Sequence, residues 1–259
     1  MSQAPETVPV DDRGLLLADG LFETVLWAKG RLDRFDRHVT RMILGCDALG
    51  LPRPDEAGLA EAALGAVERA GLSGARAAVR LTWTAGSGGR GLDRPAAPVP
   101  RLFASAAAVP ETYPPAELVR VPVRRNEGSP ASRHKTLAYL DNVLARRAAG
   151  GAEALMLNNA GIVACAAAAN LFWFEDGRLC TPALDCGALG GIMRAAVIEA
   201  AAAQGIPTSE VASGFDALRR AEGLFLTNSL IGVRPVASLE GLPVPPRPEV
   251  AALAAAVLP

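Results

Sequence analysis

Residues 132–147 read SRHKTLAYLDNVLARR and contain Lys135, one of only two lysines in a chain with twenty-four arginines. The leucines at 137, 140 and 144 are three and four residues apart, which predicts a helix over 136–147 with one buried face and places Lys135 at its mouth. A desolvated ε-amine can become neutral and nucleophilic, whereas a guanidinium stays charged. Lys135 is therefore a candidate catalytic residue. Lys29 falls in a predicted polar turn and is expected to be solvated.

Downstream of this stretch, short apolar segments alternate with turns. Strands are predicted over 154–157 and 170–174, with a hairpin turn at 158–161, so antiparallel pairing is expected. Residues 187–193 then lead into a helix predicted from about 194 to 204. Backbone N–H groups at a helix start suit an anion such as phosphate, although a plain glycine-containing helix entry explains the same pattern.

Upstream, strand-like and helix-like patterns also alternate. The predicted strands are 21–27, 31–35, 77–84 and 101–108, and the predicted helices are 36–49 and 57–70. A proline-containing stretch follows, and X-Pro steps favour extended backbone. We expect a small N-terminal α+β domain over 1–108, a linker over 109–118 and a larger domain over 119–259.

The bulk composition limits the function classes. The chain has 259 residues, 50% of them hydrophobic, so it is long enough for a substantial core. Its formal net charge of −1 gives no strong positive electrostatic field that would attract nucleic acid. No apolar run is long enough for a membrane span and no basic leader is evident, which predicts a cytoplasmic protein with a small-molecule substrate. The four cysteines show no CxxC spacing, so we predict neither a metal site nor a disulfide.

Several short motifs occur in a fixed order along almost the whole chain. They are 12–14 with 18–24, 38–41, 135–137 with 142–145, 161–163 with 170–172, 191–194, and 227–230. In that order they resemble the class IV, or fold type IV, pyridoxal-phosphate enzymes. Residues 86–91, 170–173 and 186–194 look most like the 4-amino-4-deoxychorismate lyases of that family.

The resemblance implies a two-domain α/β (α+β) fold whose larger domain has a mixed, barrel-like sheet. It also implies pyridoxal 5′-phosphate as cofactor, and Lys135 as the residue that forms the Schiff base with it and then moves protons. Arg41 matches the arginine that grips the cofactor phosphate. The remaining residues expected around the cofactor are Ile192, Met193, Thr227, Asn228 and Ser229.

One position departs from the family pattern. Cys165 stands where the family has a glutamate that pairs with the pyridine nitrogen and keeps it protonated. A thiol is mostly neutral at pH 7 and is a poor partner for a pyridinium, so the electron sink should be weaker. Transamination depends heavily on that sink, whereas the lyase reaction ends in an aromatic ring. Cys165 therefore favours a lyase, and it is also compatible with a protein that has lost activity.

The substrate carboxylate has two candidate partners, Arg90 in the glycine-rich loop and Arg13 near the N-terminus, although the pattern favours an ordinary surface arginine at either position. The strand over 101–108 lacks the arginine and histidine of D-amino-acid aminotransferases. We therefore predict a cytoplasmic, homodimeric 4-amino-4-deoxychorismate lyase of folate biosynthesis. The alternatives are a class IV aminotransferase for branched-chain or other amino acids, and a catalytically silent or non-pyridoxal binding protein.

Overall fold

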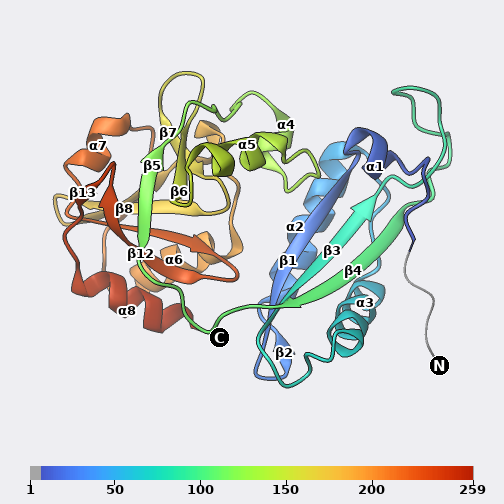
Figure 1. The fold of residues 1–259 in the computed structure, drawn as a ribbon, viewed down its shortest axis with the longest axis horizontal. Coiled ribbons are helices and arrows are strands. Elements are labelled where there is room, and N and C mark those ends of the chain that lie inside the picture. Colours follow the sequence, from blue (N-terminus) through green and yellow to red (C-terminus); the bar gives the residue numbers. More distant parts are fainter. Residues whose placement is uncertain (1–6, 259) are drawn as a thin grey trace. The chain divides into compact units, whose positions relative to one another are not determined.

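The structure, a computed structural model, describes residues 7–258 and divides into two compact units. The first unit contains the residues up to Pro110 together with Lys135–Ala138, and the second contains Glu111–His134 and the chain from Tyr139 onward (Figure 1). Part of the expected linker is regular sheet, because strand β5 begins at Ala116. The division therefore follows the spatial packing of the chain and not a single point in the sequence.

The first unit is built on a four-stranded antiparallel sheet in the order β2-β1-β3-β4. Its elements are α1 (Arg13–Leu17), β1 (Gly20–Ala28), β2 (Arg31–Leu32), α2 (Phe35–Leu49), α3 (Glu56–Arg69), β3 (Ala77–Thr84) and β4 (Arg101–Ala108). Leu21, Val79 and Leu81 of the sheet are buried with Met42 of α2 and Leu59 of α3, so both helices cover the same sheet face. The strands predicted over 77–84 and 101–108 are confirmed.

Local residues explain where the two long helices of this unit begin and end. The Asp55 side chain accepts a hydrogen bond from the Gly58 N–H at 2.8 Å and caps the start of α3. Helix α2 ends at Gly50, whose φ of +62° lies in the left-handed region that glycine adopts without strain. Helix α2 packs mainly against β1, and α3 packs against β3 and β4.

The segment Lys135–Ala138 differs from the predicted helix over 136–147. It lies beside β1, where the Phe22 N–H donates to the Lys135 carbonyl at 2.9 Å and the Leu137 N–H donates to the Gly20 carbonyl at 3.0 Å. Helix α5 begins only at Leu140, and its buried residues are Asn142 and Ala145, not the leucines. The prediction was wrong because backbone pairing with a distant strand overrides the local leucine spacing.

The second unit is built on a mixed sheet in the order β10-β9-β8-β11-β12-β5-β6-β7, with β13 paired to β12. Its strands are β5 (Ala116–Arg120), β6 (Glu153–Leu157), β7 (Val163–Ala166), β8 (Asn170–Glu175), β9 (Arg178–Pro182), β10 (Thr208–Val211), β11 (Gly223–Asn228), β12 (Gly232–Leu239) and β13 (Leu242–Pro243). Its helices are α4 (Pro130–Arg133), α5 (Leu140–Ala148), η1 (Leu184–Cys186), α6 (Ile192–Ala203), α7 (Phe215–Arg219) and α8 (Pro248–Val257). The curled mixed sheet confirms the predicted fold class.

Alternate strand residues of this unit enter separate apolar clusters. Leu171 and Trp173 of β8 pack with Leu218 of α7, whereas Phe172 and Phe174 pack with α6 and α8. This alternation follows from successive side chains of a strand pointing to opposite faces. Within the described part of the chain, no helix is both long enough and apolar enough to cross a membrane.

Candidate active site

Lys135 is held on the first unit by the pairing of its segment with β1. Its ammonium nitrogen Nζ lies 4.0 Å from the centroid of the Phe22 ring, and its side chain is half-buried. The hydroxyl of the next residue, Thr136, is buried and makes no hydrogen bond within the described structure. Lys29, by contrast, is exposed in the turn between β1 and β2, as predicted.

Arg41 on α2 is held by a carboxylate from the neighbouring strand. Glu23 of β1 accepts a hydrogen bond from Arg41 Nε at 2.7 Å, and its second oxygen accepts from Arg41 Nη2. His38 Nδ1 lies 2.7 Å from that second oxygen, and Glu23 and His38 are both almost fully buried. Burial opposes the charge on Glu23, but Arg41 and His38 outweigh it and lower the Glu23 pKa to about 2. The guanidinium is thus fixed by a carboxylate that is ionised at ordinary pH.

In the second unit, Asn170 connects the two segments that are expected around the cofactor phosphate. Thr227 of β11 pairs with Asn170 of β8, and Asn170 Nδ2 donates to the Leu189 carbonyl at 2.8 Å. A Cβ atom on Gly191 would lie 2.0 Å from Asn170 Oδ1, so the approach of this loop to Asn170 requires glycine. Asn170 therefore links the end of β11 to the start of α6.

Two polar groups at this junction suit an anion. The Thr227 hydroxyl is fully buried and makes no hydrogen bond within the described structure. Helix α6 begins after Gly191, which has no side chain to cap the first N–H groups, including those of Ile192 and Met193. Unpaired N–H groups and the helix dipole favour negative charge at such an end. The residues present therefore fit a phosphate group.

The residues that follow Thr227 form a turn. Asn228 Oδ1 accepts from the Leu230 and Ile231 N–H groups, both at 2.9 Å, and Asn228 Nδ2 donates to the Ala168 carbonyl at 2.9 Å. The Asn228 side chain thus shapes the loop, and any contact from Asn228 or Ser229 to a cofactor remains a prediction.

Cys165 lies on β7 opposite Met156 and is buried among small apolar residues such as Ala154. Burial raises the pKa of the thiol, and the nearby charge of Arg125 only partly opposes this effect. The thiol is therefore neutral at ordinary pH, as the sequence predicted.

Arg125 is a buried cation that the sequence did not reveal. It donates to the Gly187 carbonyl at 3.0 Å, to Asn142 Oδ1 at 3.1 Å and to the Ser132 carbonyl at 2.8 Å. Asn142 Nδ2 in turn donates to the Ala167 carbonyl, two residues beyond Cys165. Among the described residues, the hydrogen-bond partners of Arg125 are all neutral oxygens. The positive charge of Arg125 near Cys165 is therefore not paired with a carboxylate.

Arg13 supports the glycine-rich loop of the first unit. Its Nε donates to Asp19 at 2.9 Å, and its terminal nitrogens donate to the carbonyls of Gly91, Leu92 and Asp93 at 3.0–3.3 Å. Arg90 is exposed on the same loop. The assignment of either arginine to the substrate carboxylate remains a prediction, and the contacts of Arg13 are those of a loop support.

Glu23, Phe22 and Arg80 join Lys135 and Arg41 in the first unit and had no predicted role. Glu23 and Phe22 fall inside the motif at 18–24, but the sequence did not show which side chains they contact. Arg80 sits two residues before Thr82, which pairs with Phe22, and only the register of β1 with β3 reveals that it reaches Phe22. Within the described residues, no cluster of histidine, cysteine and acidic side chains forms a metal site.

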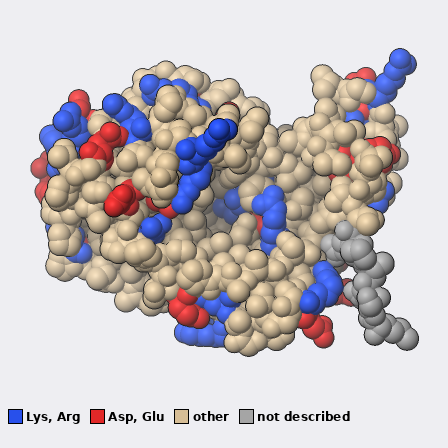
Figure 2. Space-filling view, viewed as in Figure 1, with Lys and Arg blue, Asp and Glu red and all other residues tan. Residues whose placement is uncertain are grey.

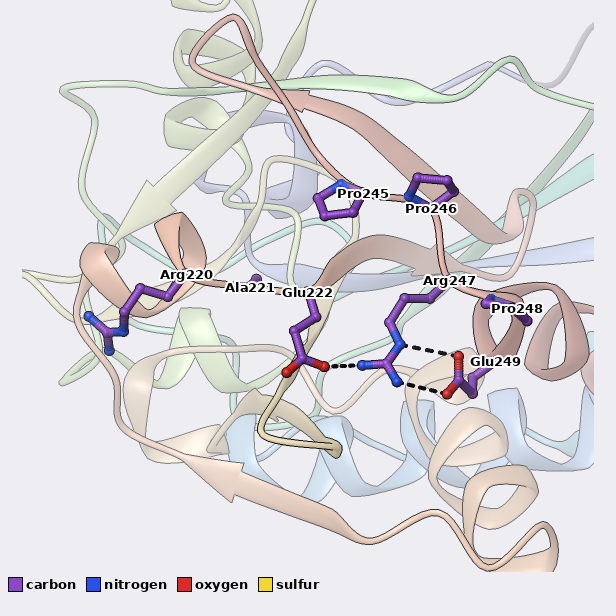
Figure 3. Close-up of a pocket in the computed structure, with 8 residues that line it drawn as sticks. All are labelled: Arg220, Ala221, Glu222, Pro245, Pro246, Arg247, Pro248 and Glu249. Atoms are coloured by element: carbon purple, nitrogen blue, oxygen red, sulfur yellow. Dashed lines mark hydrogen bonds and ion pairs between the residues drawn. The ribbon is translucent and has the colours of Figure 1, made fainter.

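An open pocket of about 620 Å³ lies in the second unit, between the start of β11 and the start of α8. Figure 3 shows Arg247 there between Glu222 and Glu249, with both carboxylates bound to its guanidinium. The same guanidinium lies 4.6 Å from the centroid of Phe174. This arginine attaches α8 to the sheet, and the two neighbouring carboxylates balance its charge.

On the face shown in Figure 2, basic and acidic side chains are intermixed over the surface.

The class IV aminotransferase model, described as "Amino-transferase class IV", matches residues 20–239. The chain belongs to the class IV aminotransferase family. Enzymes of this family depend on pyridoxal 5′-phosphate, so the predicted cofactor is confirmed at the level of the family. A hypothetical aminotransferase from Mycobacterium tuberculosis, solved in its pyridoxal-phosphate-bound form, shares the fold with a TM-score of 0.86 at 23% identity, over 99% of this chain and 94% of its own.

Individual relatives carry the names of different class IV enzymes. An aminodeoxychorismate lyase from Vibrio harveyi is 29% identical over 91% of this chain and 89% of its own length. A putative branched-chain-amino-acid aminotransferase from Methanocaldococcus jannaschii is 30% identical over 90% and 83%. The crystal structure of 4-amino-4-deoxychorismate lyase from Pseudomonas aeruginosa is 32% identical, with a TM-score of 0.85 over 97% of this chain and 94% of that one.

Proposed function

We propose that this chain is a pyridoxal-phosphate-dependent 4-amino-4-deoxychorismate lyase, which releases 4-aminobenzoate and pyruvate for folate biosynthesis. The observation that carries the choice of reaction is the neutral, buried thiol of Cys165 beside the cation of Arg125. This pair is poorly suited to keeping a neighbouring pyridine nitrogen protonated. The names of the Vibrio harveyi and Pseudomonas aeruginosa relatives support the same choice.

When bound, the cofactor withdraws electrons from the substrate carbon that loses a proton. In this proposal Lys135 would hold the cofactor covalently, and its Nζ would accept the substrate proton and return it. Arg41, which Glu23 orients, would bind the cofactor phosphate. The Thr227 hydroxyl and the first N–H groups of α6 are each suited to the same phosphate. Expulsion of the enol-pyruvyl group as pyruvate leaves an aromatic ring, which is a driving force that the substrate supplies.

An aminotransferase is the second candidate, because relatives named D-alanine and branched-chain-amino-acid aminotransferases also match most of the chain. A neutral residue at position 165 disfavours it, since reprotonation at the cofactor carbon needs a strong electron sink. A catalytically silent binding protein is the third candidate.

As in the proposed lyase class, we expect a homodimer, with a measured mass near twice 26.7 kDa.

The three candidates are separated by supplying the cofactor-loaded protein with 4-amino-4-deoxychorismate, and separately with D- or L-amino acids. We expect equal amounts of 4-aminobenzoate and pyruvate in the first reaction and little pyridoxamine phosphate in the second. Brisk pyridoxamine phosphate formation without 4-aminobenzoate would establish the aminotransferase. Neither product, from protein with bound cofactor, would establish the silent protein.

A further inference from the structure

Another pocket of the second unit lies between α7, the end of β5 and β13, and none of the residues expected around the cofactor lines it. Its volume is about 550 Å³, which is within the range of small-molecule sites. Leu218, Ala221 and Leu239 line its inner side and are buried in the apolar cluster of this unit. Residues 242–245, which are leucine, prolines and valine, line another side. The pocket therefore suits the apolar body of a ligand.

The charged side chains that line this pocket are Arg120, Arg219 and Glu240, and all three are exposed. The Glu240 carboxylate accepts a hydrogen bond from the backbone N–H of Arg120 at the end of β5. Arg219 lies 3.8 Å from Asp216, in a contact between two exposed side chains. Two guanidinium groups and one carboxylate give the lining a net positive charge, which favours an anionic group on the ligand.

Arg120 has a free guanidinium at a fixed place. Its guanidinium carbon lies 4.5 Å from the centroid of the Phe215 ring, and Phe215 is half-buried against the apolar cluster. Among the described residues, the guanidinium of Arg120 has no hydrogen bond and no ion pair. A guanidinium that packs its face on a ring keeps the N–H groups of its edge, and these can bind a carboxylate through two parallel hydrogen bonds.

The neighbouring Arg247 shows the same arrangement with its anions in place. Its guanidinium carbon lies 4.6 Å from the centroid of Phe174, and the carboxylates of Glu222 and Glu249 bind its nitrogens (Figure 3). Arg120 packs on Phe215 at nearly the same distance, but the chain supplies no carboxylate to it among the described residues. The difference points to a carboxylate that comes from a ligand.

We propose that this pocket binds an aromatic monocarboxylate, with the carboxylate on the edge of the Arg120 guanidinium and the flat ring system among the apolar residues beside Phe215. Arg219 adds to the attraction for the anion. The charge of Glu240 disfavours a second anionic group on the same ligand. The inference does not depend on the proposed lyase function, because the pocket shares no residue with the site of Lys135.

The test compares two probes, naphthalene-2-carboxylate and naphthalene-2-carboxamide, which have the same ring system and differ in charge. Dissociation constants are measured by isothermal titration calorimetry on the full chain loaded with pyridoxal phosphate. We expect the wild type to bind the carboxylate roughly 10- to 100-fold more tightly than the carboxamide, as is typical of a charge-assisted contact. In Arg120→Met this preference should fall to about one while the affinity for the carboxamide stays unchanged, and Arg120→Lys should restore part of the preference.

Arg220→Met is the matched control, because Arg220 is an exposed arginine beside Arg219 that does not line this pocket and pairs with Glu175. It should keep the wild-type preference. An unchanged preference in Arg120→Met would show that the carboxylate binds elsewhere and would overturn the proposal. Equal losses for both probes in Arg120→Met would show a structural role for Arg120 and would also overturn it. So would a wild type that binds neither probe at millimolar concentration, as expected if a second copy of the chain covers the pocket.

Discussion

Glu23 fixes the orientation of the Arg41 guanidinium, although only Arg41 is expected to contact the cofactor. Replacing the carboxylate in Glu23→Gln keeps the shape of the side chain but removes the charge that orients the guanidinium. We expect the dissociation constant of pyridoxal phosphate to rise about 10-fold in Glu23→Gln and about 10- to 100-fold in Arg41→Ala, measured by spectral titration. Glu61→Gln, an exposed change on α3, is the control. Unchanged affinity in Glu23→Gln alone would show that Arg41 needs no positioning by Glu23.

The same carboxylate makes stability depend on pH on the acid side. The Glu23 pKa is lowered from 4.5 to about 2, so the unfolded chain binds the proton more tightly than the folded one. The stabilisation is therefore complete above about pH 5 and is lost as pH falls towards 2. Denaturant unfolding between pH 5 and 2 should show a shallower decline for Glu23→Gln than for the wild type. Parallel declines would contradict the ionised pairing.

A substitution of Cys165 tests whether this residue favours the lyase reaction over transamination. In Cys165→Glu burial opposes ionisation of the new carboxylate, whereas the Arg125 charge and a pyridine nitrogen beside it would favour the ionised form. It should favour a protonated cofactor ring and raise the transaminase rate more than the lyase rate. Both rates are followed through pyridoxamine phosphate and 4-aminobenzoate formation.

Cys165→Gln is the matched control for that change, because it has the same shape without the charge. The ratio of transaminase to lyase rates should rise in Cys165→Glu and stay near the wild-type value in Cys165→Gln. Equal ratios in all three proteins would contradict the account of Cys165.

At the scale of elements, the start of α6 depends on one close approach. In Gly191→Ala the added methyl group would meet Asn170 Oδ1, so Asn170 or the helix start must move. In Gly190→Ala the nearest atom is 3.9 Å away, an ordinary contact. We expect Gly191→Ala to weaken pyridoxal-phosphate binding about 10-fold or more and Gly190→Ala to have little effect, by the same titration. Equal affinities would show that the α6 start does not bind the phosphate.

The element boundaries show what local sequence can predict. Local composition was enough to predict the strands at 77–84, which is mostly apolar and β-branched, and at 101–108, because both pair along their whole length with neighbours in the same unit. The leucine spacing after Lys135 was misleading because Leu140 and Leu144 are exposed, at 67% and 42%, and residues 135–137 pair with β1. That pairing joins positions more than a hundred residues apart, which no local pattern reports.

At the scale of the whole molecule, the recognised motifs are shared between the two units. Lys135 and Arg41 belong to the first unit, and Cys165, Ile192 and Thr227 belong to the second. Motif order was enough to propose these residues for the site. The positions of Arg80 and Arg125 required strand register and side-chain contacts, because arginine is common in this chain and its spacing alone distinguishes no single one.

The central claim is that Lys135 carries the cofactor, and a chain with two lysines allows a direct measurement. The pyridoxal-phosphate-loaded protein is reduced with borohydride, digested and mapped by mass spectrometry. We expect one pyridoxyl group per chain on Lys135, which lies against Phe22, and none on Lys29, which is exposed in a turn. Label on Lys29, or no label on freshly loaded protein, would contradict it.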